Sequence, residues 1–284
     1  MSKNNSSVDE TKESGKGVIQ RAFSLIRILA DGPAQGMRVT QIAKLASLTQ
    51  GTVHRMLQAL IDQHVVEQDE ATKHYRLSLD FYSLAARAAH PSNLRDLCRP
   101  VLIRLSISLG DTIFLLVRSG LDAICLDRCE GPLPIRSFTG DIGGRVVLGV
   151  GQGSVAILAF LPEAEREEII RMNLPRLREL GMFDEVYLRT AIESVRTLGY
   201  SAQNNGLIEG MAGVAVPIFD TTGRPVAALS VGTLSGRLNA DRLPTVVELL
   251  KREAKHLSTL INPFDSTLRK PTQNFVVNSL VKNA

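Results

Sequence analysis

The sequence predicts a mixed α+β protein with two domains, a winged helix-turn-helix unit followed by an antiparallel sheet flanked by helices. Three observations predict this fold class. Residues 39–62 (VTQIAKLASLTQGTVHRMLQALID) place apolar side chains at helical spacing on both sides of a short polar turn. Two strand-like runs separated by another polar turn follow. In the second half of the chain, short strands at hairpin spacing alternate with helical blocks, which is typical of a sheet covered by helices.

The chain of 284 residues is longer than one typical domain, and its 44% hydrophobic content is ample for two cores. It has no run of 18 apolar residues, and its first residues are polar. We therefore expect a disordered tail over 1–17, no membrane association and a soluble cytoplasmic protein. Three cysteines give no disulfide framework. Cys125 and Cys129 are expected to share one face of a strand as core residues, because no further Cys or His accompanies them as metal ligands. We expect neither a metal nor a cofactor.

The first domain is expected over 18–78. Its first helix carries an apolar stripe from Val18 to Leu29 and stops at Asp31-Gly32-Pro33. In the two helices that follow, Thr40 and Thr49 stand where side-chain oxygens can cap the first free amides. Both helices face one core through apolar residues on either side of the turn: Ile42, Leu45, Ala46, Leu48, Val53, Met56, Leu57, Leu60 and Ile61.

The outward face of the second of these helices has a composition that a folding core does not require. Its side chains are short or hydrogen-bonding and none is acidic, so the face can enter a major groove without steric or charge repulsion. The alternative is an ordinary helical hairpin inside a larger helical domain, which the preceding helix and the following β-hairpin disfavour. The expected DNA-binding residues are Thr40, Gln41, Gln50, Gly51, Thr52, His54, Arg55 and Gln58, with Lys73 and Arg76 beside His74 on the wing.

The charge of this domain is nearly balanced. From residue 18 to residue 80, seven Lys or Arg stand against six Asp or Glu, a net charge of +1. The domain therefore lacks a large basic surface, and only the geometry of its helices indicates that it binds nucleic acid. Since a unit this neutral binds phosphate weakly, useful affinity requires two or more copies on one DNA.

The rest of the chain is interpreted as a linker, a second domain and a tail. A linker helix is expected over 79–92, because residues 79–89 continue a helical pattern that His90-Pro91-Ser92-Asn93 breaks. The second domain is expected over 93–263 and a flexible tail over 264–284. The expected elements are strands at 112–117, 123–127, 135–138, 213–219 and 225–231, and helices at 93–109, 154–161, 163–172, 183–198 (closed by Gly199) and 241–261.

The glycine-rich segment 148–154 (LGVGQGS) leads into an apolar helix but is a poor phosphate loop. It has Gly-x-Gly-x-Gly and lacks the lysine of such loops. It can instead present free amides at a helix N-terminus to an anionic group such as a carboxylate. Close packing of the helix on the sheet explains the small residues equally well. The segment therefore leaves both interpretations open.

No catalytic pattern is recognisable. The chain has no Gly-x-Ser-x-Gly elbow and no His-Glu-x-x-His, and its five histidines are not clustered. Asp127 and Glu130 form a possible carboxylate pair, but scattered acids of this kind are usually solvated. We therefore expect no catalytic residues and no enzyme.

Two motifs resemble a known family. The segment 51–57 (GTVHRML) is similar to the reading-helix motif of the IclR family of bacterial transcriptional regulators. The segment 210–220 (GMAGVAVPIFD), with Gly223 and 226–231 (VAALSV), resembles the signature near the end of that family's effector domain. The likeness runs from about Val18 to Ile261 and includes Arg145 between the two motifs.

The resemblance implies a dimer or a dimer of dimers whose winged helices bind a partly palindromic double-stranded DNA operator. It also implies a GAF-like domain that holds a small organic effector, a carboxylate or an aromatic compound, and RNA polymerase as a further partner. The residues that the resemblance assigns to effector binding are Cys125, Asp127, Arg145, Gly151, Gln152, Asn205, Gly213, Ala215, Ser230 and Gly232.

Two departures from the family pattern prevent transfer of an effector's identity. Residues 204–206 (NNG) stand where many relatives carry an acidic residue, and Val147 stands where proline is frequent. Two alternative functions also remain open. One is a constitutive DNA-binding protein whose second domain only forms oligomers, and the other is a metabolite-binding, enzyme-like module with an appended helical domain.

Overall fold

The computed structural model describes residues 7–88, 94–132, 135, 141–181, 184–204 and 208–261. The chain divides into two compact units between His90 and Pro91, inside the expected break at 90–93. Each unit has its own hydrophobic core, and the α+β class predicted from the sequence is confirmed. No helix among the described residues is long and apolar enough to cross a membrane.

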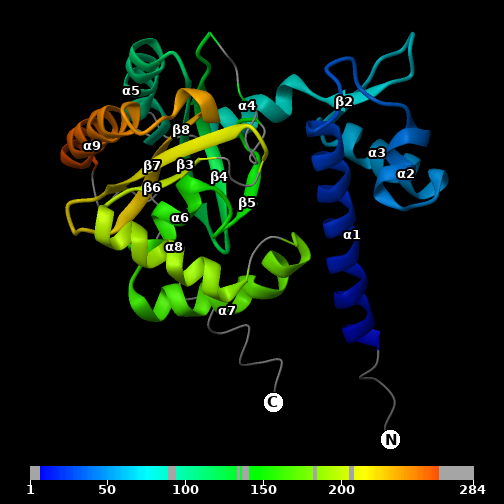
Figure 1. Cartoon of the computed structure of the whole chain (residues 1–284). Coiled ribbons are helices and arrows are strands. Elements are labelled where there is room, and N and C mark those ends of the chain that lie inside the picture. Colours follow the sequence, from blue (N-terminus) through cyan, green and yellow to red (C-terminus); the bar gives the residue numbers. More distant parts are fainter. Residues whose placement is uncertain are drawn as a thin grey trace, which may run out of the picture. The chain divides into compact units, whose positions relative to one another are not determined.

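The first unit is a three-helix bundle with a β-hairpin (Figure 1). Its core joins all three helices and the hairpin through Leu25, Ile42, Val53, Leu57 and Tyr75, each at most 3% exposed. The two hairpin strands are antiparallel, with Glu67 opposite Arg76. The elements are α1 (Ser7–Ala30), α2 (Val39–Ala46), α3 (Gln50–Asp62), β1 (Val66–Gln68), β2 (Tyr75–Leu77) and α4 (Leu79–Ala88).

Three expectations for this unit are wrong in detail. Helix α1 begins at Ser7, so residues 7–17 are helical and not a disordered tail, because the Glu and Lys residues of this polar segment favour helix. Arg38, and not Thr40, is the N-cap of α2. Leu45 is 62% exposed and lies outside the core, because Ile42 and Ala43 form the buried face of this short helix.

The second unit is a six-stranded antiparallel sheet with helices on both faces, in the strand order β5-β4-β3-β8-β7-β6. Its elements are α5 (Leu94–Leu109), β3 (Thr112–Ser119), β4 (Asp122–Cys129), β5 (Arg145–Val147), α6 (Gln152–Ala159), α7 (Glu163–Glu179), α8 (Glu185–Leu198), β6 (Ser201–Asn204), β7 (Met211–Phe219), β8 (Pro225–Leu234), the 3₁₀ turn η1 (Ser235–Arg237) and α9 (Arg242–Leu260).

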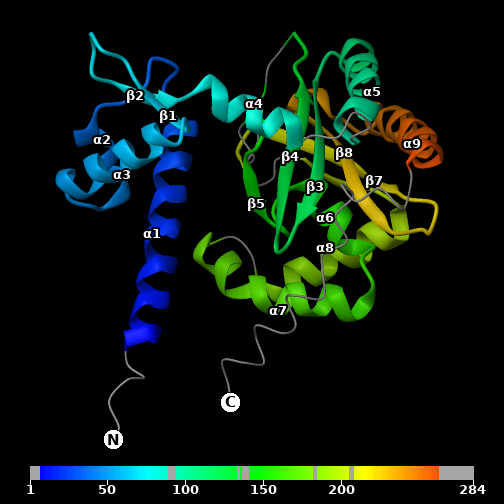
Figure 2. The same ribbon diagram turned by 180° about the vertical axis from the view of Figure 1, so that it is seen from behind.

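Helices cover both faces of the sheet (Figures 1 and 2), and alternating side chains of the central strands fill a core on each face. Along β3, Ile113 and Leu115 pack with α5 and α9, whereas Phe114 and Leu116 pack on the side of α6, α7 and α8. Both faces of the central strands are buried, which explains why these strands are almost continuously hydrophobic.

Several elements of the second unit differ from the expectations. Sequence patterns do not predict strands β5 and β6, and of the strand expected over 135–138 only Ile135 is described, outside any strand. Helix α7 continues past residue 172, through Pro175, to Glu179. Helix α8 begins at Glu185, because the Asp184 side chain caps it by accepting from the Tyr187 N–H at 2.7 Å. The tail expected over 264–284 lies outside the described residues.

A β-bulge separates the two cysteines of β4, for which the sequence predicts a shared face. Leu115 pairs with Asp127 and Leu116 pairs with Cys125, so Leu126 is an extra residue in β4. As a result, Cys125 lies in the core beside α6, whereas Cys129 packs against the core beside α5 and α9. The prediction of a shared face is therefore wrong, because simple alternation ends at the bulge.

Candidate nucleic-acid interface and ligand cavity

The outward face of α3 is exposed, and several of its side chains form no hydrogen bond or ion pair with the described residues. Val53 and Leu57 point into the core, so residues on the opposite side of the helix face solvent. Gln50, His54 and Arg55 make no hydrogen bond or ion pair with any residue that the structure describes. These side chains are therefore free to bind a partner without breaking an interaction inside the unit.

Other predicted contact residues take part in helix capping. The Thr49 hydroxyl accepts from the Thr52 N–H at 3.3 Å and lies 2.9 Å from the Thr52 hydroxyl, which confirms Thr49 as the cap of α3. The Gln41 side-chain oxygen accepts from the Arg38 N–H at 2.9 Å at the start of α2. Gln41 thus has one structural bond, while its NH₂ group remains a potential donor.

The remaining predicted DNA-binding residues lie in and around α2, α3 and the hairpin. Thr40 is exposed in the first turn of α2, Gly51 is exposed in the first turn of α3, and Gln58 donates to Asp62 at 3.5 Å. Lys73 occupies the hairpin turn with φ of +58°. Arg76 pairs with Glu67 at 2.5 Å, so its charge is compensated within the wing.

The hairpin turn is ordered by the Asp69 carboxylate. It accepts hydrogen bonds from the Thr72 N–H at 2.7 Å, the Thr72 hydroxyl at 2.8 Å and the Ala71 N–H at 3.1 Å. The bonds from Thr72 hold the pKa of Asp69 below its ordinary value. This arrangement holds Lys73 on the returning side of the turn, where its N–H donates to the Asp69 carbonyl at 2.9 Å.

Sequence reasoning missed Arg38 as a basic residue of this surface. Its Nε atom lies 3.4 Å from Nε2 of His74, which joins the start of α2 to the wing. The proximity arises from the pairing of Met37 with Tyr75, a contact between segments far apart in the sequence. Helical periodicity alone gives no signal for it.

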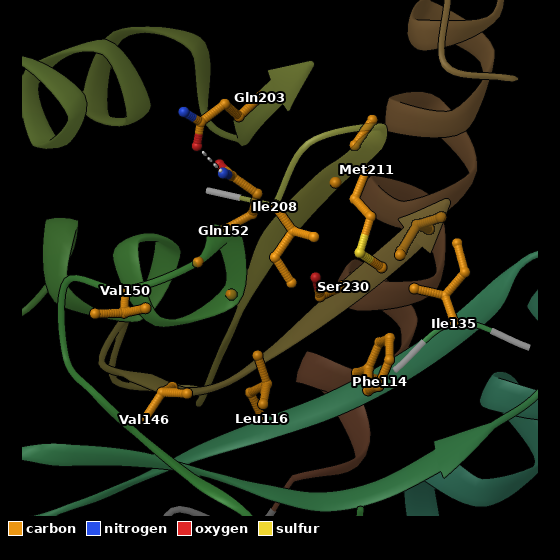
Figure 3. Close-up of a pocket in the computed structure, with 16 residues that line it drawn as sticks. Phe114, Leu116, Ile135, Val146, Val150, Gln152, Gln203, Ile208, Met211 and Ser230 are labelled. Carbon is orange, nitrogen blue, oxygen red and sulfur yellow. Dashed lines mark hydrogen bonds between the residues drawn. The ribbon is translucent and has the colours of Figure 1, made fainter. Parts of the chain in front are cut away.

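The second unit contains a cavity between the N-terminus of α6 and the α6-facing side of the sheet (Figure 3). It encloses about 670 Å³, including the part open to solvent. Its apolar lining includes Phe114, Leu116, Ile135, Val146 and Met211, and no charged side chain is among the described residues that line it.

Three polar side chains face this cavity. Gln152 donates from Nε2 to Oε1 of Gln203 at 2.8 Å and accepts from the Ser201 hydroxyl at 2.5 Å. Ser230 is only 8% exposed, and no described residue hydrogen-bonds to its hydroxyl. Figure 3 shows it in the middle of the lining, between Leu116 and Ile135. A ligand can therefore satisfy a buried polar group there.

Glycines permit the close approach of α6 to the sheet. Gly151 is the N-cap of α6 with φ of +75°, a conformation that favours glycine. A Cβ atom on Gly153 would overlap Cδ1 of Leu116 in β3. Within the sheet, one on Gly232 would lie 2.9 Å from the Phe114 ring. Both interpretations of the 148–154 segment thus have support, because Gly153 serves packing while the free end of α6 faces the cavity.

The predicted effector-binding residues separate into two groups. Gly151, Gln152, Gly213, Ser230 and Gly232 line the cavity. Cys125, Asp127, Arg145 and Ala215 do not line it, and Asn205 lies outside the described residues.

The four residues away from the cavity have other surroundings. Cys125 and Ala215 are fully buried in the core beneath α6. The bulge at Leu126 turns Asp127 to the opposite side of the sheet, where Arg99 binds it at 3.1 Å. Arg145 lies on the edge strand and pairs with Asp122 at 3.3 Å.

Sequence reasoning missed most of the apolar lining and Gln203. Phe114 and Leu116 could have been found by pairing β3 with β8, since Phe114 lies opposite Ser230 in the register. Gln203 belongs to a short polar edge strand whose sequence carries no strand signal. No group of three or more metal-binding side chains is found in the described part of the chain.

Comparison with known proteins gives consistent matches over both units. The model of the IclR helix-turn-helix domain matches residues 18–70, and that of the C-terminal domain of the bacterial transcriptional regulator IclR matches residues 86–259. The chain is 30% identical over 243 residues to a probable transcriptional regulator, SauR of Cupriavidus necator, covering 84% of this chain and 94% of the relative. It is 25% identical over 250 residues to the transcriptional repressor AllR of Escherichia coli, covering 88% and 92%. These relatives are named as regulators and not as enzymes.

Solved structures share the fold. The IclR protein of Thermotoga maritima superposes with a TM-score of 0.68 at 22% identity, covering 86% of this chain and 98% of that one. An IclR homologue of Microbacterium hydrocarbonoxydans, solved in complex with 4-hydroxybenzoate, superposes with a TM-score of 0.70 at 24% identity, covering 85% and 98%. At these identities the similarity establishes the fold alone.

Proposed function

Because the chain belongs to the IclR family of bacterial transcriptional regulators, we propose that it binds an operator sequence-specifically and that a small organic effector changes its operator affinity. The observation that carries the DNA-binding part is the exposed, uncommitted face of α3. Arg55 and His54 contact base edges or phosphate, while Gln50 and Thr52 fix the register of the helix in the major groove.

The near-neutral charge of the first unit supports binding as a homodimer or a dimer of dimers. Two weak phosphate-binding units on one DNA gain affinity through their linkage. Half-sites are then spaced by about 34 Å, one turn of the duplex, or by a multiple of it. Exposed apolar side chains on α1, namely Val18, Ile19 and Phe23, offer a surface that association can bury.

The cavity supports an effector with an apolar body and a hydrogen-bonding end, such as an aromatic compound or a carboxylate. Its walls are apolar, Ser230 lacks a partner among the described residues, and the N-terminus of α6 favours an anion. The relative solved with 4-hydroxybenzoate binds a compound of this class. Control requires that the effector bind the DNA-competent and DNA-incompetent arrangements with different affinities.

We also propose that the protein acts as a repressor, which when bound to its operator keeps RNA polymerase from the promoter. The support for this is that the relative AllR is named a repressor.

The DNA-binding role is tested by selecting binding sites from a random duplex library and then titrating variants electrophoretically. Arg55→Ala is expected to weaken binding to the selected operator by about 1 to 3 kcal/mol, the contribution of one base-reading side chain. Arg178→Ala, which removes an exposed arginine from α7, is the matched control and should bind like the wild type. Undiminished binding by Arg55→Ala would reject the role of this residue, and failure to select any site would reject the function.

The effector role is tested by calorimetry with aromatic acids, beginning with 4-hydroxybenzoate, with and without the selected operator. We expect the dissociation constant to differ between the two conditions. Ser230→Leu fills the cavity and should abolish binding, whereas Thr197→Leu, on the exposed side of α8, should not. Equal affinities in both conditions would indicate a constitutive DNA-binding protein, and chemical turnover of the ligand would indicate an enzyme.

A further inference from the structure

A second hollow in the effector unit lies between α8 and the edge strand β6. This α8–β6 groove encloses about 1190 Å³, including the part open to solvent. Helix α8 contributes Tyr187, Thr190 and Ser194. Tyr200 precedes β6, and Ser201 is the first residue of that strand. The groove is distinct from the first cavity but shares Gly151, Gln152 and Gln203 with it.

The lining of the α8–β6 groove is amphipathic and uncharged. One part consists of aliphatic side chains, and the other carries hydroxyl and amide groups. The hydroxyls of Thr190 and Ser194 form no hydrogen bond with any described residue. No Asp, Glu, Lys, Arg or His is among the described residues that line the groove. The Lys251 ammonium group lies beside it and is already engaged, since it donates to the Leu198 carbonyl at 2.8 Å and lies 5.2 Å from the centre of the Tyr200 ring. The aliphatic part is made of Val155, Ala191, Val195 and Leu198.

The wall between the two hollows is a pair of hydrogen-bonded amides (Figure 3). Gln203 accepts from Gln152 at 2.8 Å through its oxygen, and its NH₂ group donates to no described residue. A hydroxyl group in the α8–β6 groove can therefore accept from Gln203 without breaking this bond. Gln152 is held in turn by Ser201, which keeps the shared wall in place.

From these features we infer that the α8–β6 groove is a second small-molecule site, which takes an uncharged ring compound bearing hydroxyl groups. The ring packs on the aliphatic part, and the hydroxyls bind Ser194, Thr190 and Gln203. A carboxylate is disfavoured, because no cationic side chain lines the groove and the Lys251 ammonium group beside it is held by the Leu198 carbonyl. This site does not depend on the proposed regulatory function, since its occupancy can be measured without DNA.

The chain can be given a single fluorescent reporter of ligand binding. It contains no tryptophan, so Leu198→Trp introduces a single tryptophan at the edge of the α8–β6 groove, where Leu198 is 47% exposed. The full-length Leu198→Trp protein is titrated with 4-hydroxybenzyl alcohol and with resorcinol, both uncharged at neutral pH. We expect a saturable change in tryptophan fluorescence for at least one of them, and at least tenfold weaker binding for 4-hydroxybenzoate.

Second substitutions in the Leu198→Trp background locate the binding. Ser194→Phe fills the groove and should raise the dissociation constant at least tenfold, with Thr190→Phe as a second blocking variant if the first fails to fold. Gln203→Leu removes the amide donor and should raise it at least threefold. Thr197→Phe, on the same helix but outside the groove, and Ser230→Leu, in the first cavity, should change it less than twofold.

Two results would overturn the inference. One is the absence of saturable binding for both neutral probes. The other is binding that Ser230→Leu abolishes and the groove-filling variants leave intact, which would place the probe in the first cavity. Loss of operator binding by Arg55→Ala has no bearing on either result, so the two proposals fail independently.

Discussion

Two helical glycines, Gly153 and Gly51, occupy opposite surroundings and therefore serve different purposes. Gly153 lies where any side chain would overlap Leu116 and would bring its Cβ within 3.4 Å of Ser230 Cβ. Gly51 has open space around it, because a Cβ atom at this position would meet nothing within 4 Å. Packing thus explains Gly153, whereas nothing inside the first unit explains Gly51.

Gly153→Ala is expected to lower the free energy of unfolding by about 1 to 3 kcal/mol, the usual cost of forcing an extra methyl group into a packed core. Leu116 must move into the cavity to make room, so ligand affinity should fall as well. Urea denaturation of the full-length protein measures the first effect. An unchanged midpoint and slope would contradict the tight packing of α6 on β3.

Gly51→Ala is expected to have the opposite effect on stability and a separate effect on function. Alanine favours helix over glycine, so the free energy of unfolding should rise by up to about 1 kcal/mol. The added methyl group stands on the face proposed to enter the major groove, so operator affinity should fall. Denaturation and operator titration of one protein sample separate the two effects, and unchanged operator affinity would argue against close approach at this position.

At the scale of elements, the turn between β7 and β8 depends on the Asp220 carboxylate. One of its oxygens accepts from the Thr222 N–H at 2.8 Å, the Thr222 hydroxyl at 2.6 Å and the Arg224 N–H at 3.0 Å. Burial alone raises the pKa of Asp220, but these hydrogen bonds outweigh burial and hold the pKa below the ordinary value of 3.8. The ionised carboxylate therefore stabilises the turn that joins two central strands.

The contribution of Asp220 should depend on pH in a defined direction. Because its pKa is lower in the folded state, its stabilisation is present above pH 3.8 and is lost as pH falls through the folded pKa. Asp220→Asn keeps an acceptor but does not titrate. The difference in free energy of unfolding between wild type and Asp220→Asn, measured by urea denaturation, should be constant above about pH 5 and shrink below it. A constant difference throughout would contradict this assignment.

The elements that sequence patterns predict are those with strong periodicity, and those they miss are short or irregular. Helices α3, α5 and α9 and strands β3, β7 and β8 are expected within a few residues of their observed bounds. Strands β5 and β6 are missed, because three or four residues at a sheet edge carry too little pattern. The bulge at Leu126 could not be predicted either, since it depends on the pairing of β4 with β3.

The same distinction between local patterns and long-range contacts applies to the candidate sites. The exposed face of α3 follows from helical spacing, because burial of Val53 and Leu57 determines which side remains outside. The cavity depends on contacts between strands far apart in the sequence, so sequence patterns single out two parts of its lining, the glycine-rich loop and Ser230, but not Phe114. Asp127 lies on the face away from the cavity, because the bulge reverses the face of the β4 residues that follow it.

At the scale of the whole molecule, the first unit has a small net charge, so each basic residue provides a large share of its attraction for phosphate. Lys73 lies in the hairpin turn with φ of +58°, and no described side chain pairs with its ammonium group. Arg76, by contrast, is paired with Glu67. In the proposed complex, each wing therefore presents the uncompensated charge of Lys73 to the duplex.

Lys73→Asn removes this charge and retains the backbone conformation, which asparagine tolerates well. We expect the slope of log affinity against log salt to decrease by about one for each wing on the DNA, hence by about two for a dimer. Preference for the selected operator over unrelated DNA should not change, because phosphate contacts carry no sequence information. An unchanged salt slope would place the wing away from the phosphate backbone.

The free side chains on the outer face of α3 have a consequence for how such a regulator diverges. Gln50, His54 and Arg55 bind nothing within the described chain, so exchanging them sacrifices no internal bond. Gln41 is different, since replacing it also removes the cap that starts α2. Under the proposed DNA-binding role, substitutions at these three positions can change the preferred operator at little cost in folding stability, while Gln41 stays constrained by its capping bond in α2.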